Sequence, residues 1–232
     1  MTQRPHQTMN FRQPLPGLYR SGNLGSLSQQ GQTELLNLGI TRIIDLRTRA
    51  ERQLDPPPFL GRSEYLNLSL LPYRNRALNT ASAEAKDNGD YAVAHLEYAA
   101  NQIVTILSTL LDAPPGPVLV HCHAGKHRTG LVVALCLELA GKSREEVAAD
   151  YVQSGPELIE FYAGIRPRKT PEQWVRIEPF QPCVPDDMLR PLTSLDGEWG
   201  GVSKYLAAYG FSEKEQKALA HRLQTHQARS TC

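Results

Sequence analysis

The 232-residue sequence has few cysteines and no long run of apolar residues. Its four cysteines, at positions 122, 136, 183 and 232, are widely and irregularly spaced. This spacing argues against a disulfide framework and against a zinc site with closely paired ligands. The most apolar stretch, residues 130–140, is far shorter than the ~20 residues of a membrane-spanning helix. We therefore expect free thiols in a reducing compartment and no integral membrane segment.

Charge of one sign is also lacking, because the formal net charge is only +1. Such a chain is not expected to bind nucleic acid as a whole, and any anion site must be a local group of residues. Residues 1–17 contain no apolar segment of the secretory type, which favours the cytoplasm and leaves export without a classical signal open. We expect loosely ordered residues 1–13, one domain over residues 14–225 and a tail at residues 226–232.

Short apolar runs alternate with helical patterns, which predicts an α/β fold. Residues 42–46 and 118–120 are apolar runs of strand length, the second typical of a strand that is buried on both faces. Leucines, alanines, isoleucine and valine at helical spacing predict one long helix over residues 91–111. The polar residues 74–90 before it predict a long loop. Within the proline-rich residues 156–191 we expect either a lid or insert over the site or a solvated charged loop.

The chemistry lies in residues 121–130, HCHAGKHRTG, between an apolar strand and an apolar helix. A tight loop at a helix N-terminus turns backbone N–H groups inward and forms a cradle for a dianion. Arg128 can bind two phosphate oxygens with its planar guanidinium group. Small residues at positions 124 and 125 predict a close approach of the backbone to the ligand.

Cys122 stands at the strand end of this loop. A lone cysteine there is usually a small buried apolar group. Here the helix N-terminus and neighbouring cations favour the thiolate, so we expect a nucleophile that attacks phosphorus in line. Thr129 can donate its hydroxyl to the sulfur when the sulfur leaves, and His121 is expected to fix the loop through backbone hydrogen bonds.

The segment resembles the signature HCxxGxxRTG of the protein tyrosine phosphatase superfamily. It is similar to the bacterial tyrosine phosphatases with HCxAGKDRTG and to phosphoinositide phosphatases with HCKAGKGRTG. Residues 18–22, 39–47, 150–151 and 200–206 look like further family positions. The resemblance implies a central, mainly parallel sheet flanked by helices, a phosphocysteine intermediate, no cofactor and no metal. It also implies Cys122 as nucleophile, Arg128 as phosphate clamp and Thr129 as the assisting hydroxyl.

The implied substrates are phosphoproteins, at tyrosine or with dual specificity, and phosphoinositides. The residues expected to bind them are His123, Ala124, Gly125, Lys126, His127 and Arg128. Lys126 matches the loop lysine that the family associates with lipid-phosphate and broad specificity. His127 departs from the bacterial pattern, which has Asp at that position. A protonated His127 would add positive charge at the mouth of the loop, and an exposed residue without a role is the alternative.

The proton for the leaving group needs a general acid. Asp90 and Asp87 are the candidates in the polar segment before the predicted helix. Asp90 is favoured by its spacing from the cysteine, although it could equally cap that helix. His127, or no dedicated acid at all, remains an alternative. Without a placed acid the chain would be a weak, phosphate-binding pseudophosphatase, while a sulfurtransferase or arsenate reductase fits the Arg-Thr-Gly ending less well.

Overall fold

The structure is a computed structural model that describes residues 4–71 and 74–225. Five strands form one sheet in the order β1-β2-β5-β3-β4. Neighbouring strands run parallel except for β1 and β2, which are antiparallel. The strands are β1 (Arg12–Leu15), β2 (Leu18–Ser21), β3 (Arg42–Asp45), β4 (Tyr65–Asn67) and β5 (Val118–His121).

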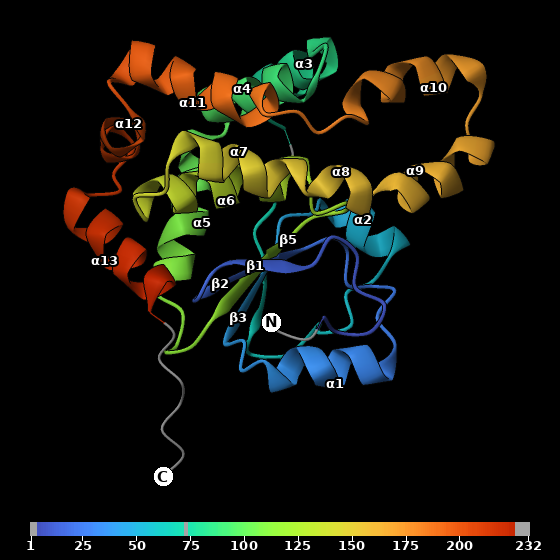
Figure 1. Ribbon diagram of the computed structural model, residues 1–232, viewed down its shortest axis with the longest axis horizontal. Coiled ribbons are helices and arrows are strands. Elements are labelled where there is room, and N and C mark those ends of the chain that lie inside the picture. The colour runs from blue at the N-terminus through green and yellow to red at the C-terminus, as the bar shows by residue number, and fades with distance from the viewer. Residues whose placement is uncertain (1–3, 72–73, 226–232) are drawn as a thin grey trace.

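Helices cover both faces of this sheet (Figure 1). The helices before β5 are α1 (Gln29–Asn37), α2 (Arg49–Leu54), α3 (Arg76–Glu84), α4 (Asn88–Tyr98) and α5 (Ala100–Leu111). The later ones are α6 (His127–Leu139), α7 (Arg144–Val152), α8 (Ser154–Glu157), α9 (Ile159–Ile165), η1 (Arg166–Arg168), α10 (Pro171–Ile177), η2 (Glu178–Phe180), α11 (Asp186–Trp199), α12 (Val202–Ala208) and α13 (Glu213–Gln224). Among the described residues, no helix is long and apolar enough to cross a membrane.

The alternation of side chains along the strands explains why helices cover both faces of the sheet. Val118 and Val120 of β5 belong to the larger core, whereas Leu119 between them belongs to the smaller one. Successive side chains of a strand point to opposite faces, so a strand that is apolar throughout must be covered on both. The expected α/β fold with a central, mainly parallel sheet flanked by helices is confirmed.

The sheet places the cysteine loop, which we define as residues 122–128, at the middle of one edge. The strand before it, β5, is central, and its last residue His121 is level with Ser21 of β2 and Asp45 of β3. The carboxyl ends of three parallel strands therefore meet where the loop begins. Ligands of open α/β sheets bind at this kind of edge.

The expected single helix over residues 91–111 is instead two helices that meet at Ala99. Ala99 has φ −122° and ψ 20°, outside the helical region, and Asn75 Nδ2 donates to the carbonyl of Tyr98 at 2.7 Å. The two halves also have different partners, because α4 packs on α11 while α5 packs on α13. Apolar spacing continues through the break, so it could not reveal the change of direction.

The expected loop over residues 74–90 contains a helix. Asn75 caps α3 by accepting a hydrogen bond from the Leu78 N–H at 3.0 Å. Leu78 is the one residue of α3 that is buried. Leu78 is the only large apolar residue of this segment, which is why its composition was interpreted as a loop.

The described part of the N-terminus, residues 4–13, is packed rather than loosely ordered. Asn10 and Phe11 are buried, and Arg12 already belongs to β1. Asn10 and Arg12 bond to groups of the domain, among them the Ala124 carbonyl and Asp150, so the polar composition was misleading. Residues 1–3 and the predicted tail at residues 226–232 lie outside the described residues.

The proline-rich stretch forms a projecting segment that we call the arm, residues 159–180, with α9, η1, α10 and η2. None of these residues, all of which the structure describes, is buried. Figure 1 shows α9 and α10 extending beyond the helices that cover the sheet. Prolines stand at the starts of η1, α10 and η2, where a missing N–H costs little.

Candidate active site

Cys122 lies between the end of β5 and the start of α6, as expected, with only 3% of its surface exposed. The residue before α6 is Lys126, and its side chain does not cap the helix. The first N–H groups of a helix have no partner within the helix. Together with the helix dipole they form an anion site beside the sulfur.

A glycine at position 125 is needed for the packing of the protein itself and not for ligand binding. Its φ is +67°, and a Cβ at this position would lie 2.4 Å from the carbonyl of Ser21. The sequence suggested that this glycine allows the backbone to approach the ligand. The structure shows that it allows the cysteine loop to pack against the end of β2.

Arg128 is held by Glu51 of α2. The Arg128 Nη1 and Nη2 atoms donate to the two carboxylate oxygens at 2.8 and 2.6 Å, and Nη1 lies 3.4 Å from the Leu46 carbonyl. A guanidinium has five N–H donors, so donors remain for a phosphate group. Burial alone would raise the pKa of Glu51, but Arg128 outweighs it and brings the pKa to about 2. The Glu51 carboxylate that orients Arg128 is therefore ionised.

The sequence did not reveal this role of Glu51. The neighbouring Arg47 does not share it, because Arg47 is buried and binds Asp45. The signal that could have located Glu51 is its capping box with Thr48, which starts α2 just after β3. Because β3 adjoins β5, that helix start must lie beside the cysteine loop.

His121 is fully buried under the loop and fixes it, as expected. Its Nδ1 lies 3.3 Å from the carbonyl of Cys122, and its Nε2 lies 3.7 Å from Asp45 Oδ2. Burial lowers the pKa of His121, and the charge of Asp45 only partly offsets that effect. His121 thus supports the backbone of the nucleophile from the interior.

Lys126 does not point into a phosphate site. Its side chain is buried, and its Nζ donates to the carbonyls of Phe180, Gln181 and Pro182 at 2.5, 2.9 and 2.8 Å. The same ammonium lies 5.5 Å from the centre of the Tyr162 ring. The expectation that Lys126 binds substrate is therefore corrected, because its three hydrogens bond to one carbonyl at the end of the arm and two just after it.

His127 is a half-buried neutral residue in the structure. Its ring packs against Tyr91 and Phe180, with centroids 5.4 and 6.2 Å apart. Burial, followed by the charges of Lys126 and Arg128, lowers the pKa of His127 well below its ordinary value. It therefore adds no positive charge at the mouth of the loop. His123 is exposed there, and Phe161 of α9 packs edge-on against it at 5.6 Å.

The two acid candidates are both bound to Arg190 of α11. Arg190 donates to Asp87 at 2.9 and 3.1 Å and to Asp90 at 2.8 Å. Asp87, and not Asp90, is the cap of α4. Burial would raise the pKa of Asp87, but hydrogen bonds from Arg190 and the Asp90 N–H outweigh it and lower the pKa. Within the described residues, neither carboxylate forms a hydrogen bond or ion pair with the cysteine loop.

Thr129 of α6 and Tyr91 of α4 are two further polar residues of interest near the start of α6. Thr129 Oγ1 is buried and has no hydrogen-bond partner among the described residues, which leaves its hydroxyl available. Tyr91 was not identified from the sequence. Burial raises the pKa of Tyr91 to about 12, and the positive charge of Arg128 only partly opposes this, so the phenol keeps its proton at neutral pH.

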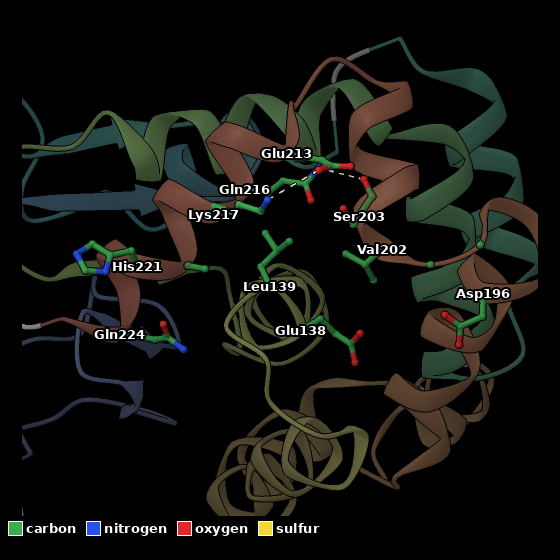
Figure 2. A pocket seen from close by; sticks show the side chains of 13 residues that line it. Glu138, Leu139, Asp196, Val202, Ser203, Glu213, Gln216, Lys217, His221 and Gln224 are labelled. Atoms are coloured by element: carbon green, nitrogen blue, oxygen red, sulfur yellow. Dashed lines mark hydrogen bonds and ion pairs between the residues drawn. The ribbon is translucent and has the colours of Figure 1, made fainter.

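A hollow of about 510 Å³ lies elsewhere, between the end of α6 and helices α12 and α13 (Figure 2). Glu138, Val202 and His221 are among the residues that line it, and Gln216 Nε2 donates to the Ser203 carbonyl on its wall at 3.0 Å. Its lining contains no residue of the cysteine loop. Size alone therefore does not identify the site, which is defined by the strand, the loop and the helix start.

Cys122 directly follows the central strand, Arg128 ends the loop, and the start of α6 faces both. This arrangement defines a cysteine-dependent phosphatase site. Comparison with protein families matches residues 15–225 to the tyrosine phosphatase family. The chain belongs to this family.

Three relatives illustrate the similarity. A tyrosine-protein phosphatase of Nostoc commune is 28% identical, over 90% of this chain and 75% of its own. The triple specificity protein phosphatase PtpB of Mycobacterium tuberculosis is 32% identical, over 65% of each chain. A putative tyrosine-protein phosphatase of Cupriavidus necator is 27% identical, over 82% of this chain and 72% of its own.

Proposed function

We propose that this phosphatase hydrolyses phosphate monoesters through a phosphocysteine intermediate. The placement of Cys122 between β5 and the uncapped start of α6, with Arg128 in the first turn, carries the proposal. The thiolate attacks phosphorus, the ester P–O bond breaks and the alcohol or phenol leaves with a proton from the general acid or from water. The loop N–H groups and Arg128 stabilise the charge that develops on the phosphoryl oxygens. Water then cleaves the phosphorus–sulfur bond, and the hydroxyl of Thr129 assists the departing sulfur.

We propose phosphorylated proteins as substrates, at tyrosine and at serine or threonine, with phosphoinositides as a further class. Support for breadth comes from the relative that is named a triple specificity phosphatase. The loop lysine no longer supports it, because Lys126 is bonded to the arm. The free thiols of Cys122, Cys136 and Cys183 agree with a reducing, cytoplasmic site of action.

We also propose that the arm acts as a lid. Its residues contact the cysteine loop at three points, through Phe161 on His123, Tyr162 beside Lys126, and Phe180 on His127. These contacts come from both ends of the arm, α9 and η2. Substrates that approach His123 must therefore pass this segment.

The first test measures phosphate release by the wild type and by Cys122→Ser, with a chelator present. The substrates are a phosphotyrosine peptide, a phosphothreonine peptide and a panel of phosphoinositides. Release by the wild type that is absent in the variant supports the cysteine mechanism, and the preferred substrate shows the specificity. A folded wild type that binds phosphate and releases none from any substrate would contradict the proposal and indicate a pseudophosphatase.

A further inference from the structure

Three successive peptide groups of the cysteine loop are held at their carbonyl oxygens, which belong to residues 123, 124 and 125. The Asn23 N–H donates to the first at 2.7 Å. Asn10 Nδ2 donates to the second and third at 3.1 and 3.0 Å. Arg20 Nη2 donates to the third as well, at 2.7 Å. Every one of these donors approaches the loop from the side of β2 and the N-terminal segment.

A planar trans peptide points its N–H away from its C=O. The carbonyls of residues 123, 124 and 125 belong to the peptides whose N–H groups are those of residues 124, 125 and 126. Holding the three carbonyls on one side therefore directs the three N–H groups to the other side. That side is the interior of the loop, where an anion beside Cys122 would lie.

The side chain of Asn10 is itself held in the orientation that donation to these carbonyls requires. Its Oδ1 accepts a hydrogen bond from Arg12 Nη1, so its amide nitrogen must face the loop and the Ser154 hydroxyl, 3.2 Å away. Its backbone has φ +52°, a left-handed conformation that asparagine tolerates better than most residues. Arg12 is held in turn by Asp150, which its Nε reaches at 2.8 Å.

Arg20 brings a buried positive charge behind the loop. Its side chain is fully buried and forms an ion pair with Asp150, which also pairs with Arg12. Burial would raise the pKa of Asp150, but Arg20 and Arg12 outweigh it and lower the pKa. Two guanidinium groups around one carboxylate leave a net positive charge beside the peptides that face the anion, which strengthens their N–H groups as donors.

We propose that Asn10 and Arg20 are positioning residues that aim the phosphate-binding N–H groups of residues 124–126. Asn10 then contributes to the active site from the N-terminal segment, although it does not belong to the cysteine motif. The inference rests on the proposed function, because it gives these N–H groups the task of binding a substrate phosphate.

The test is Asn10→Ala, which removes the amide from both carbonyls. The matched control is Thr8→Val, which removes a buried side-chain hydrogen bond to Pro5 and one from Arg4 in the same segment, without touching the loop. The measurements are kcat and KM with p-nitrophenyl phosphate, the inhibition constant of inorganic phosphate, and Tm. For Asn10→Ala we expect kcat/KM to fall about 10- to 100-fold and phosphate to bind about tenfold more weakly. Thr8→Val should lose as much Tm with neither kinetic change.

Equal kinetics for Asn10→Ala and Thr8→Val would overturn the inference. If Asn10→Ala does not fold, Asn10→Asp decides, because aspartate tolerates the same backbone conformation and keeps the bond to Arg12 but presents an acceptor to the two carbonyls. Wild-type phosphate binding in that variant would overturn the inference too. If the wild type releases no phosphate, the proposed function fails. Calorimetric binding of inorganic phosphate to the wild type and Asn10→Ala then still decides this inference by the same tenfold difference.

Discussion

Glu51 binds Arg128 through both carboxylate oxygens, at 2.8 and 2.6 Å. Paired N–H···O bonds of this kind fix the plane of a guanidinium group as well as its position. The same carboxylate also accepts from the N–H and hydroxyl of Thr48 and closes the capping box of α2. One side chain therefore starts a helix and orients Arg128.

Glu51→Gln separates these two tasks, because glutamine can still close a capping box but cannot accept two charge-assisted bonds. We expect kcat/KM with p-nitrophenyl phosphate to fall about 10- to 100-fold, with little loss of Tm. The control is Thr48→Val, which should cost about 1 kcal/mol of unfolding free energy and leave kcat/KM unchanged. Wild-type kinetics in Glu51→Gln would show that Arg128 needs no such partner.

Asp90→Asn and Asp87→Asn test the source of the leaving-group proton. An alkoxide needs that proton far more than nitrophenolate does, so phosphothreonine and p-nitrophenyl phosphate distinguish a general acid from a structural residue. We expect Asp90→Asn to slow phosphothreonine hydrolysis about 100-fold and nitrophenyl hydrolysis little. Asp87→Asn should lower stability, because Asp87 caps α4 and binds Arg190. If neither substrate responds to Asp90→Asn, Tyr91→Phe is the next variant.

Lys126→Met tests whether the loop lysine attaches the arm. Methionine keeps the apolar part of the side chain and loses the three hydrogen bonds to residues 180–182. We expect amide hydrogen exchange in residues 159–180 to rise at least about tenfold, since a charge-assisted hydrogen bond contributes roughly 1.5–3 kcal/mol. Lys169→Met, at an exposed position of the arm, should change nothing. Unchanged exchange in Lys126→Met would mean that other contacts hold the arm.

His95 predicts a loss of stability in mild acid. Burial lowers the pKa of His95 to about 4, although its hydrogen bond to the Tyr91 carbonyl raises it somewhat. In the unfolded chain it should titrate near pH 6.5, so the unfolded state binds a proton first as the pH falls. The contribution of His95 to the unfolding free energy should therefore be fully present above about pH 6.5. It should decline toward pH 4, by at most about 3 kcal/mol. His95→Gln, which does not titrate, should remove this part of the pH dependence in denaturant titrations. A wild-type slope retained in that variant would assign it to other groups.

The sequence predicted the parts of the site that are contiguous in the chain. The strand, the cysteine loop and the helix occupy residues 118–139 without a gap, and local pattern is sufficient for such a unit. The residues that hold the loop were missed because they are distant in sequence. Glu51 is 77 residues from Arg128, and Asn10 is 115 residues from Gly125. No local spacing connects such pairs, and each of these side chains also has an ordinary interpretation as a surface residue.

The fold, like the site, was predictable where it depends on local sequence and not where it depends on distant contacts. The strands and the capped helices follow from alternation and capping residues, whereas the break at Ala99 follows from two different packing partners, α11 and α13. Tertiary contacts of this kind override local propensity. The role of Lys126 is of the same type, because a lysine in a phosphate loop gives no local sign that its charge faces the arm.

The small number of contacts that attach the arm has a consequence for the size of the substrate. The arm buries no side chain of its own, and it is held by the hydrogen bond from Lys126 to Phe180 together with the ring contacts of Phe161 and Phe180 with the cysteine loop. These contacts contribute a few kcal/mol in total, so a ligand with a moderate interface can displace the arm. With the arm as the proposed lid, we expect a whole phosphorylated protein, and not only a short peptide or a soluble headgroup, to reach Cys122 by displacing it.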